Sequence, residues 1–348
     1  MNKYISIFFC VQIIALNLFA MQPKVTPVDY VRPQIDTHKS RWFFFSSASR
    51  PFGMVSLSPD TWTEGSWNSG YLYNSKEIRC FSHVHCWQLA GVPVMPTTGE
   101  VKGHKGMDAY KSTYSHETEI VKPGYHKVEL DTYQIRVELT STSRVGMHRY
   151  TYPAGEKANV LFDVGALLAH GKTEKAAIHR ISSKEIGGYS VLAPTSRRKK
   201  PVTVYFVARF NQNMTAFGGW EKEGKEKKLV HKNSIEGADI GGYASFGKLK
   251  KQTLLMKVGI SYVSEEQARI NLEKELAHWN FDRVKEDAFA EWNRELGKIT
   301  VEGGSEEEKI KFYTDLWHSL LGRHTFSDFN GKYIDNTGEE PVVRQVPL

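Results

Sequence analysis

Apolar and polar residues alternate through most of this chain, from about residue 29 to residue 262, and a period of two is that of a half-buried β-strand. Ile135, Val137 and Leu139, for example, alternate with polar neighbours. Longer β-branched and aromatic runs occupy residues 202–210 and 253–262, and Gly, Pro, Asn and Asp separate the runs. The predicted fold is mainly β, a large antiparallel β-sandwich (supersandwich) over residues 28–262.

The period changes at Ser264, where Ser264–Gln267 has the pattern of a helix capping box. A second helix is predicted over 282–296, because four apolar residues fall on one face: Val284, Ala288, Trp292 and Leu296. A further capping box at Ser305–Glu308 predicts a helix to about Leu321, and residues 341–348 predict no regular element. We therefore expect a helical linker at 263–303 and a further helical unit at 304–348.

The helix after Ser305 is unusually apolar, with Phe312, Leu316 and Trp317 among its residues. Two arrangements remain open for it. Either it folds back on the sandwich, or its partner helices lie outside these residues, since an exposed patch of this size is unfavourable.

Residues 1–20 have the pattern of a cleaved secretory signal: Lys3, an apolar stretch from Ile5 to Phe19, and a small residue at Ala20. Export to a bacterial periplasm or cell surface is expected. No other stretch is apolar enough to span a membrane, so none is predicted after cleavage.

The net charge and the cysteine content limit the kinds of partner and of covalent or metal bond that are expected. The formal net charge is +7, but the dense basic runs at 197–200 and 248–251 lie outside any nucleic-acid motif, so nucleic acid is not an expected partner. After signal removal only Cys80 and Cys86 remain; they are close enough in sequence to pair, and they lack metal-ligand spacing.

Candidate binding residues gather between positions 50 and 85. The segment Arg50–Asp60 is predicted to be a strand that ends in a turn. The next loop carries Trp62 and Trp67 among small polar residues, which suits a sugar platform or core packing. His83 and His85 are expected on one face of an extended segment, as structural groups, sugar ligands or two ligands of a metal.

An ordered series of short segments resembles the N-terminal part of glycoside hydrolase family 92, the calcium-dependent exo-α-mannosidases. The segments are Val28–Val31, Arg50–Val55, Leu57–Thr61, Ser69–Tyr71, Phe81–His83, Met95–Gly99, Tyr114–Glu117, Lys122–Tyr125, Glu138–Thr140, Arg144–Tyr150, Phe312–Tyr313, His318–Leu321 and Phe326–Asp328. Their order extends from about residue 28 to residue 331.

The resemblance implies a β-sandwich, a helical linker and an (α/α)6 catalytic barrel, with the active site between sandwich and barrel. It implies hydrolysis of terminal α-mannosides of mannose-containing glycans, with inversion and with Ca²⁺ in the full-length family. By this resemblance Asp60, Trp67, Ser82 and His83 are the expected substrate-binding residues. No Ca²⁺ ligand is assigned to a residue of this chain.

This chain departs from the family pattern in two ways. The barrel that carries the catalytic acid and base has no counterpart beyond residues 304–348, the start of a truncated catalytic domain, so no catalytic residue is assigned. The segment Arg41–Ser46 replaces a Gly-rich turn. The chain is therefore expected to be inactive alone. Two alternatives are a carbohydrate-binding module and a structural half that assembles with a separate barrel.

Overall fold

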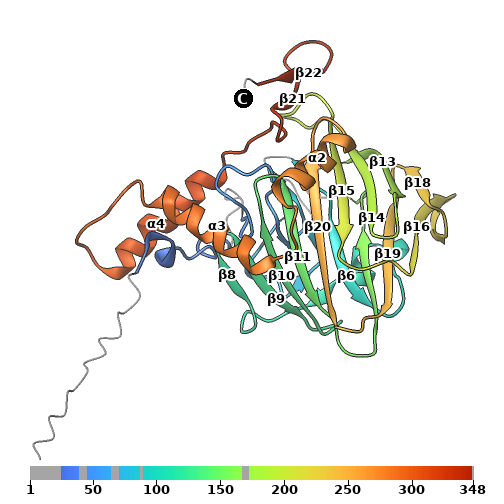
Figure 1. Cartoon of the computed structure of the whole chain (residues 1–348), viewed down its shortest axis with the longest axis horizontal. Helices are drawn as coiled ribbons and strands as arrows, with labels where there is room; N and C mark the ends of the chain where they lie inside the picture. Colours follow the sequence, from blue (N-terminus) through green and yellow to red (C-terminus); the bar gives the residue numbers. More distant parts are fainter. Residues whose placement is uncertain (1–24, 39–44, 64–69, 87–88, 167–171, 347–348) are drawn as a thin grey trace, which may run out of the picture.

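Two antiparallel sheets contain most of the strands of the described residues (Figure 1). The computed structural model describes residues 25–38, 45–63, 70–86, 89–166 and 172–346, so the signal segment and Trp67 lie outside the described residues. The nine-stranded sheet has the order β18 (Ser234–Gly237), β13 (Thr173–Arg180), β14 (Glu185–Leu192), β15 (Val202–Phe210), β20 (Thr253–Ser261), β11 (Val145–Thr151), β10 (Ile135–Ser141), β9 (Tyr125–Leu130) and β8 (Ile120–Lys122). The seven-stranded sheet has the order β1 (Ser58–Asp60), β3 (Cys80–Ser82), β6 (Val94–Thr98), β12 (Lys157–Phe162), β19 (Gly241–Lys248), β16 (Ala216–Glu223) and β17 (Glu226–Val230).

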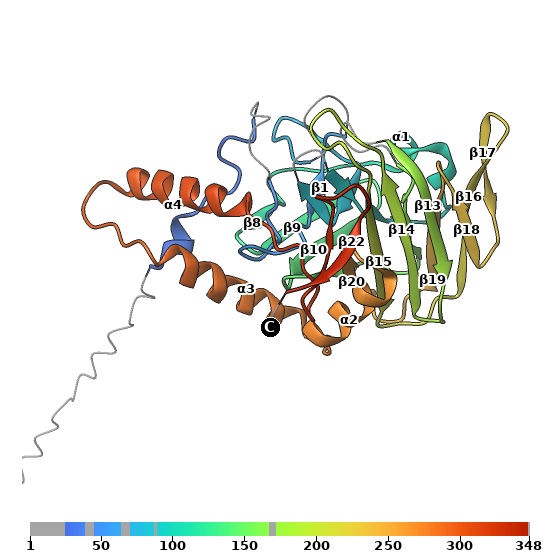
Figure 2. The same ribbon diagram turned by 90° about the horizontal axis from the view of Figure 1, so that it is seen from above.

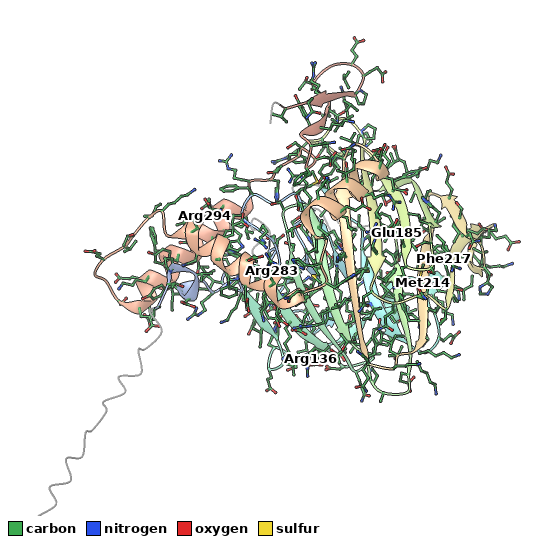
Figure 3. All side chains as sticks on the ribbon, viewed as in Figure 1. Arg136, Glu185, Met214, Phe217, Arg283 and Arg294 are labelled. Atoms are coloured by element: carbon green, nitrogen blue, oxygen red, sulfur yellow. The ribbon has the colours of Figure 1, made fainter. Side chains whose placement is uncertain are left out.

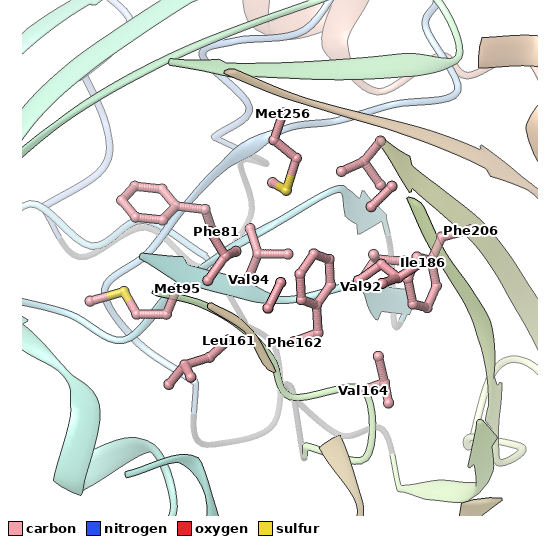
Figure 4. Packing of buried hydrophobic residues seen from close by; sticks show 14 of the residues in the cluster. Phe81, Val92, Val94, Met95, Leu161, Phe162, Val164, Ile186, Phe206 and Met256 are labelled. Carbon is pink, nitrogen blue, oxygen red and sulfur yellow. The ribbon is translucent and has the colours of Figure 1, made fainter. Parts of the chain in front are cut away.

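The two sheets pack face to face over one apolar core (Figure 4). Phe162 of the seven-stranded sheet stacks on Phe206 of the nine-stranded sheet, with ring centroids 5.9 Å apart. Phe246 likewise meets Phe210 at 4.9 Å. The β-branched and aromatic runs at 202–210 and 253–262 become β15 and β20, so the predicted β-sandwich is confirmed.

Smaller elements complete the fold. Three strand pairs lie outside the main sheets: β2 (Glu77–Ile78) with β7 (Ser112–Thr113), β4 (Val84–Cys86) with β5 (Leu89–Gly91), and β21 (Lys332–Asp335) with β22 (Val342–Gln345). The helices are η1 (Pro27–Tyr30), η2 (Gly103–Lys105), α1 (Met107–Tyr110), α2 (Glu265–Glu275), α3 (Phe281–Leu296) and α4 (Glu306–Leu321). None of the helices in the described ranges is long and apolar enough to cross a membrane.

Helix α2 lies on the outer face of the nine-stranded sheet. Its N-cap is Ser264, as predicted, whose hydroxyl accepts a hydrogen bond from the Gln267 amide at 3.1 Å. A Cβ on Gly259 of β20 would lie 2.4 Å from the Ala268 carbonyl oxygen, so only glycine lets the helix backbone approach this closely. Glu185 of β14 then pairs with Arg209 and with Arg269 of α2, which ties the helix to the sheet.

Helices α3 and α4 lie side by side and project away from the sheets (Figure 2). Trp292 of α3 and Trp317 of α4 are fully buried, with ring centroids 5.9 Å apart. The turn η1 covers the same cluster, because Tyr30 stacks on Tyr313 at 5.7 Å. The buried face of the apolar helix thus packs on α3 and the N-terminal turn, and partner helices outside these residues remain a prediction.

Two local predictions are wrong. The segment from Arg50 to Leu57 forms no strand, and β1 occupies Ser58–Asp60, where the predicted strand was expected to end in a turn. Residues Val342–Gln345 form β22, which the sequence does not signal because all four side chains are exposed. The pairing of Cys80 with Cys86, which the sequence left open, does not occur, since both are free thiols.

Arg50 joins the sandwich to α3. Its guanidinium donates to the Ser141 carbonyl of β10 at 2.7 Å and to the Val284 carbonyl of α3 at 3.1 Å, and it pairs with Glu291 at 2.6 Å. The adjacent Ser49 carbonyl accepts a hydrogen bond from the Trp292 indole at 2.7 Å. The Arg50 segment therefore holds the linker helix against the sheet.

Replacing Arg50 with Met is expected to lower the free energy of unfolding by roughly 2–3 kcal/mol, because two buried carbonyls and Glu291 lose a charged donor. Urea denaturation measures the change. Arg136→Met is the matched control: Arg136 pairs with Glu129 on the sheet surface, where an ion pair contributes less than about 1 kcal/mol (Figure 3). Equal losses in the two variants would contradict the role of Arg50.

Candidate functional site

A buried carboxylate at the end of β1 organises the predicted binding segment. Strands β1 and β3 pair so that Asp60 lies opposite Cys80 and Ser58 lies opposite Ser82. The Asp60 carboxylate accepts hydrogen bonds from the Ser82 hydroxyl at 2.5 Å, the Cys80 thiol at 3.3 Å and the His85 ring at 2.9 Å. Asp60 and Ser82, predicted together from the sequence, therefore meet, and we call Asp60, Cys80, Ser82 and His85 the Asp60 cluster.

His85 is a protonated partner in this cluster. Its Nδ1 faces the Ser56 carbonyl at 2.7 Å, so that nitrogen donates a hydrogen bond. Its Nε2 faces the Asp60 carboxylate, so that nitrogen donates as well. Burial opposes the charge, but the attraction of Asp60 and these hydrogen bonds prevail and raise the pKa of His85 above its usual value. Asp60 and His85 thus form a buried ion pair.

His83 belongs to a different set of contacts. The chain bends at His83 between β3 and β4, so His83 and His85 do not share one face as the extended pattern predicted. His83 Nδ1 lies 2.7 Å from the Val92 carbonyl, and its Nε2 lies 2.8 Å from Nε2 of His148. Tyr150 completes the row, with its hydroxyl 2.8 Å from His148 Nδ1.

The direction of these hydrogen bonds follows from their ends. The Val92 carbonyl only accepts, so His83 Nδ1 donates and His83 Nε2 accepts. His148 Nε2 then donates, and its Nδ1 accepts the Tyr150 hydroxyl proton. Both imidazoles are neutral in this arrangement. Burial lowers the pKa of His83 to about 4 and the pKa of His148 well below its usual value.

The structure gives His83 an interior position. The ring is fully buried, and a Cβ on Gly146 would lie 2.7 Å from its Cδ2 atom. Both ring nitrogens contact protein groups. A sugar contact of His83, like those of Asp60 and Ser82, remains a prediction.

The segment that carries Trp67 starts and ends directly above the Asp60 cluster. Trp67 itself lies outside the described residues, but Trp62 and Gly70 on either side pair through backbone hydrogen bonds of 3.0 and 3.1 Å. The Thr61 amide also donates to the Gly70 carbonyl at 3.0 Å. A Cβ on Gly70 would lie 3.7 Å from the His85 ring, so Gly70 lies close to the ion pair.

A largely apolar cavity of about 370 Å³ lies on the other side of β4. Its lining includes Cys86, Leu89 and Tyr262 of the sandwich and His324 and Phe326 of the segment that follows α4. His324 Nδ1 donates to the Gly53 carbonyl at 3.0 Å, and the Thr325 amide donates to the Phe52 carbonyl at 2.9 Å. The cavity therefore forms only where the C-terminal segment docks on the sandwich.

The described residues do not supply a calcium site of the kind the resemblance implies. Ca²⁺ takes six to eight oxygen ligands. In the described ranges the group that could hold a metal ion is Asp36, Asp315 and His318, which offers two carboxylates and one imidazole. This donor set does not fit Ca²⁺, and we derive no chemistry through a metal.

The sequence did not predict the role of His85, Cys80 or His148. His85 was considered only together with His83, and Cys80 only as a disulfide candidate. Ser82 and His85 are three residues apart, and on a continuous strand their side chains would lie on opposite faces. Both reach the Asp60 carboxylate only because the strand breaks at His83. No local sequence signal reports such a break.

Residues 30–261 match the glycosyl hydrolase family 92 N-terminal domain, and residues 267–344 match the family 92 catalytic domain. The chain belongs to glycosyl hydrolase family 92, and the resemblance seen in the sequence is confirmed.

Solved structures agree with this assignment. A family 92 α-mannosidase from Bacteroides thetaiotaomicron is 28% identical, with a TM-score of 0.82; the match covers 94% of this chain and 45% of that chain. A family 92 inverting mannosidase from the same species is 24% identical with a TM-score of 0.78, covers 93% of this chain and 44% of that chain, and shows likeness of fold.

A curated relative from Arthroderma benhamiae, described as an uncharacterized secreted glycosidase, is 23% identical over 330 residues. That match covers 86% of this chain and 40% of the relative. The chain thus spans less than half the length of the relatives it matches.

Stability is expected to fall as the pH drops from about 6.5 to about 4. In this range His83 and His148 become protonated in the unfolded chain but stay neutral where they are buried in the folded protein. The pKa of each histidine in the folded protein lies below its value in the unfolded chain. The stability that the two neutral histidines provide is therefore complete above the unfolded pKa and is lost as the pH falls toward the folded pKa. For His83 alone the loss at pH 4.5 is roughly 2.5 kcal/mol. Urea denaturation at pH 7.5, 6 and 4.5 tests this.

His148→Gln is the comparison variant for this measurement, since an amide keeps a donor and an acceptor but does not titrate. The variant is expected to be less stable at pH 7.5 and to lose less stability on acidification. Parallel pH profiles for the two proteins would contradict the assignment of neutral histidines.

Proposed function

We propose that these residues form the N-terminal sandwich, the linker and the beginning of the catalytic domain of an exported α-mannosidase that acts on mannose-containing glycans. The observation that carries this proposal is the 28% identity to an α-mannosidase structure across 94% of this chain, with only 45% of that chain covered. Inversion and dependence on Ca²⁺ are part of the proposal and rest on the family resemblance.

In this proposal the sandwich contributes one wall of the glycan site. Asp60, Ser82 and His83 are proposed to contact the glycan, and Trp67 is proposed as the aromatic platform for a sugar face. The buried Asp60–His85 pair lies close to Gly70, which follows the segment that contains Trp67. Removing one partner of such a pair leaves an uncompensated buried charge, so it is well suited to fix a loop.

The proposed reaction needs groups that these residues do not supply. Inverting hydrolysis uses an acid and a base roughly 6.5–9.5 Å apart. In the Asp60 cluster there is one carboxylate, and it is bound to three protein donors. We therefore propose that a polypeptide of residues 21–348 alone has no α-mannosidase activity and that a catalytic barrel is the partner of this half.

Export is the remaining part of the proposal. The N-terminal pattern of residues 1–20 predicts a cleaved signal, and the Arthroderma benhamiae relative is described as secreted. A bacterial periplasm or cell surface is the proposed location. Amino-terminal sequencing of the mature protein is expected to begin after Ala20.

Incubation of residues 21–348 with α-1,2-mannobiose and Ca²⁺ is expected to release no mannose above the rate without protein. An immunoblot of the source cells with antibody against the sandwich is expected to detect a band at about twice the 39.6 kDa of this chain, a two-domain size. Mannose release that a chelator abolishes would overturn the inactivity. A band near 39.6 kDa would overturn the two-domain enzyme.

In the native enzyme, Ser82→Ala is expected to lower kcat/KM for an α-mannoside about tenfold, because Asp60 loses one short charge-assisted hydrogen bond. Ser112→Ala is the matched control, since Ser112 is an equally buried hydroxyl on β7 that contacts the backbone around Thr113 and Thr132. Unchanged kinetics of Ser82→Ala, or an equal loss in Ser112→Ala, would contradict a role of the Asp60 cluster in glycan binding.

A further inference from the structure

A second, polar cavity lies near the Asp60 cluster, since its lining residue Met107 packs against Cys80 of that cluster. It holds about 680 Å³ and is bounded by Thr63, by α1, by the start of β13, by the β16–β17 hairpin and by the loop before β19. Its charged lining residues are Lys172, Lys222, Lys227, Asp163 and Asp239. Three lysines against two aspartates leave an excess of one positive charge.

Asp163 is the buried polar group of this cavity. Asp163 is only 4% exposed, and its Oδ2 accepts a hydrogen bond from the Tyr110 hydroxyl at 2.7 Å. Its Oδ1 has no hydrogen-bond partner among the residues the structure describes. Burial of a carboxylate oxygen without a partner is costly, so a ligand hydroxyl that donates to Oδ1 would be stabilising.

The lysines that line the cavity indicate that the ligand carries an anionic group. Lys222 and Lys227 lie directly opposite each other on β16 and β17, a pairing of like charges that destabilises a sheet. Asp239 compensates Lys227 at 2.5 Å. Lys222 and Lys172 form no ion pair within the described ranges, so two uncompensated ammonium groups border the cavity.

We propose that this cavity binds a saccharide with an anionic substituent: a sugar hydroxyl donates to Asp163 Oδ1, and the anionic group lies against Lys172 and Lys222. A bare anion would satisfy the lysines but would meet the Asp163 carboxylate with no proton to donate. A neutral sugar would satisfy Asp163 and leave the lysines uncompensated. A phosphate and a carboxylate are both suitable anionic groups.

This inference goes beyond the proposed mannosidase function and does not depend on it. The charged lining residues are all different from the four residues of the Asp60 cluster, and the described lining residues lie between positions 63 and 239. The measurement is binding, so it is unaffected by whether the chain hydrolyses anything.

Isothermal titration of residues 21–348 with glucose 6-phosphate, glucuronic acid, glucose and inorganic phosphate tests the proposal. One or both anionic sugars are expected to bind with a Kd of about 1 mM or tighter, and at least tenfold more tightly than glucose or inorganic phosphate. Comparison of the two anionic sugars tells whether phosphate or carboxylate is preferred. Binding is expected to weaken at high ionic strength, because salt screens the lysines.

The double variant Lys172→Gln, Lys222→Gln is expected to weaken the binding of the anionic sugar at least tenfold. Lys225→Gln is the matched control, since Lys225 lies at the tip of the same hairpin and outside the cavity lining. Asp163→Asn keeps an acceptor for Tyr110; it is expected to weaken the sugar and to leave inorganic phosphate unchanged or tighter. Thermal melting of each variant establishes that it is folded.

Three results would overturn the proposal. One is the absence of heat with either anionic sugar at about ten times the expected Kd. Another is inorganic phosphate binding as tightly as glucose 6-phosphate, which would mean an anion site without sugar recognition. The third is unchanged affinity in the folded double-lysine variant.

Discussion

The Arg50 guanidinium is the contact on which the arrangement of sandwich and linker depends. It reaches a carbonyl of β10, a carbonyl of α3 and the carboxylate of Glu291, so one side chain spans the boundary between sheet and helix. The neighbouring residues extend this junction: the Ser49 carbonyl binds Trp292, and the Gly53 carbonyl binds His324. The segments before and after α4 are thus both held by one stretch of chain, and the apolar cavity beside Cys86 exists because of it.

Buried polar groups also gather at the edge of the seven-stranded sheet. Two separate sets lie there: the ionised Asp60–His85 pair, and the neutral row of His83, His148 and Tyr150. The two sets differ in charge because His85 faces the Asp60 carboxylate, whereas His83 faces only a carbonyl and the His148 imidazole. The first set lies close to Gly70, and the second is fully buried.

The sequence predicted the strands at 202–210 and 253–262 and the helices at 282–296 and 306–321 well, because their apolar patterns are local and strong. It also predicted Asp60 and Ser82 together, through the family resemblance. It failed for β22, whose exposed residues carry no pattern, and it did not predict that the N-terminal turn packs on α4. His85 was missed because its role depends on a chain bend at His83.

By itself the sequence determined the class of fold, the starts of helices α2 and α4 and the membership of glycosyl hydrolase family 92, since periodicity, caps and ordered motifs are all properties of neighbouring residues. Only the tertiary structure decided which groups face one another. It set the protonation of three buried histidines, left both cysteines free and placed Asp163 in one cavity with Lys172 and Lys222. Those outcomes depend on burial and on the charge of residues far apart in the chain, and no local pattern contains that information.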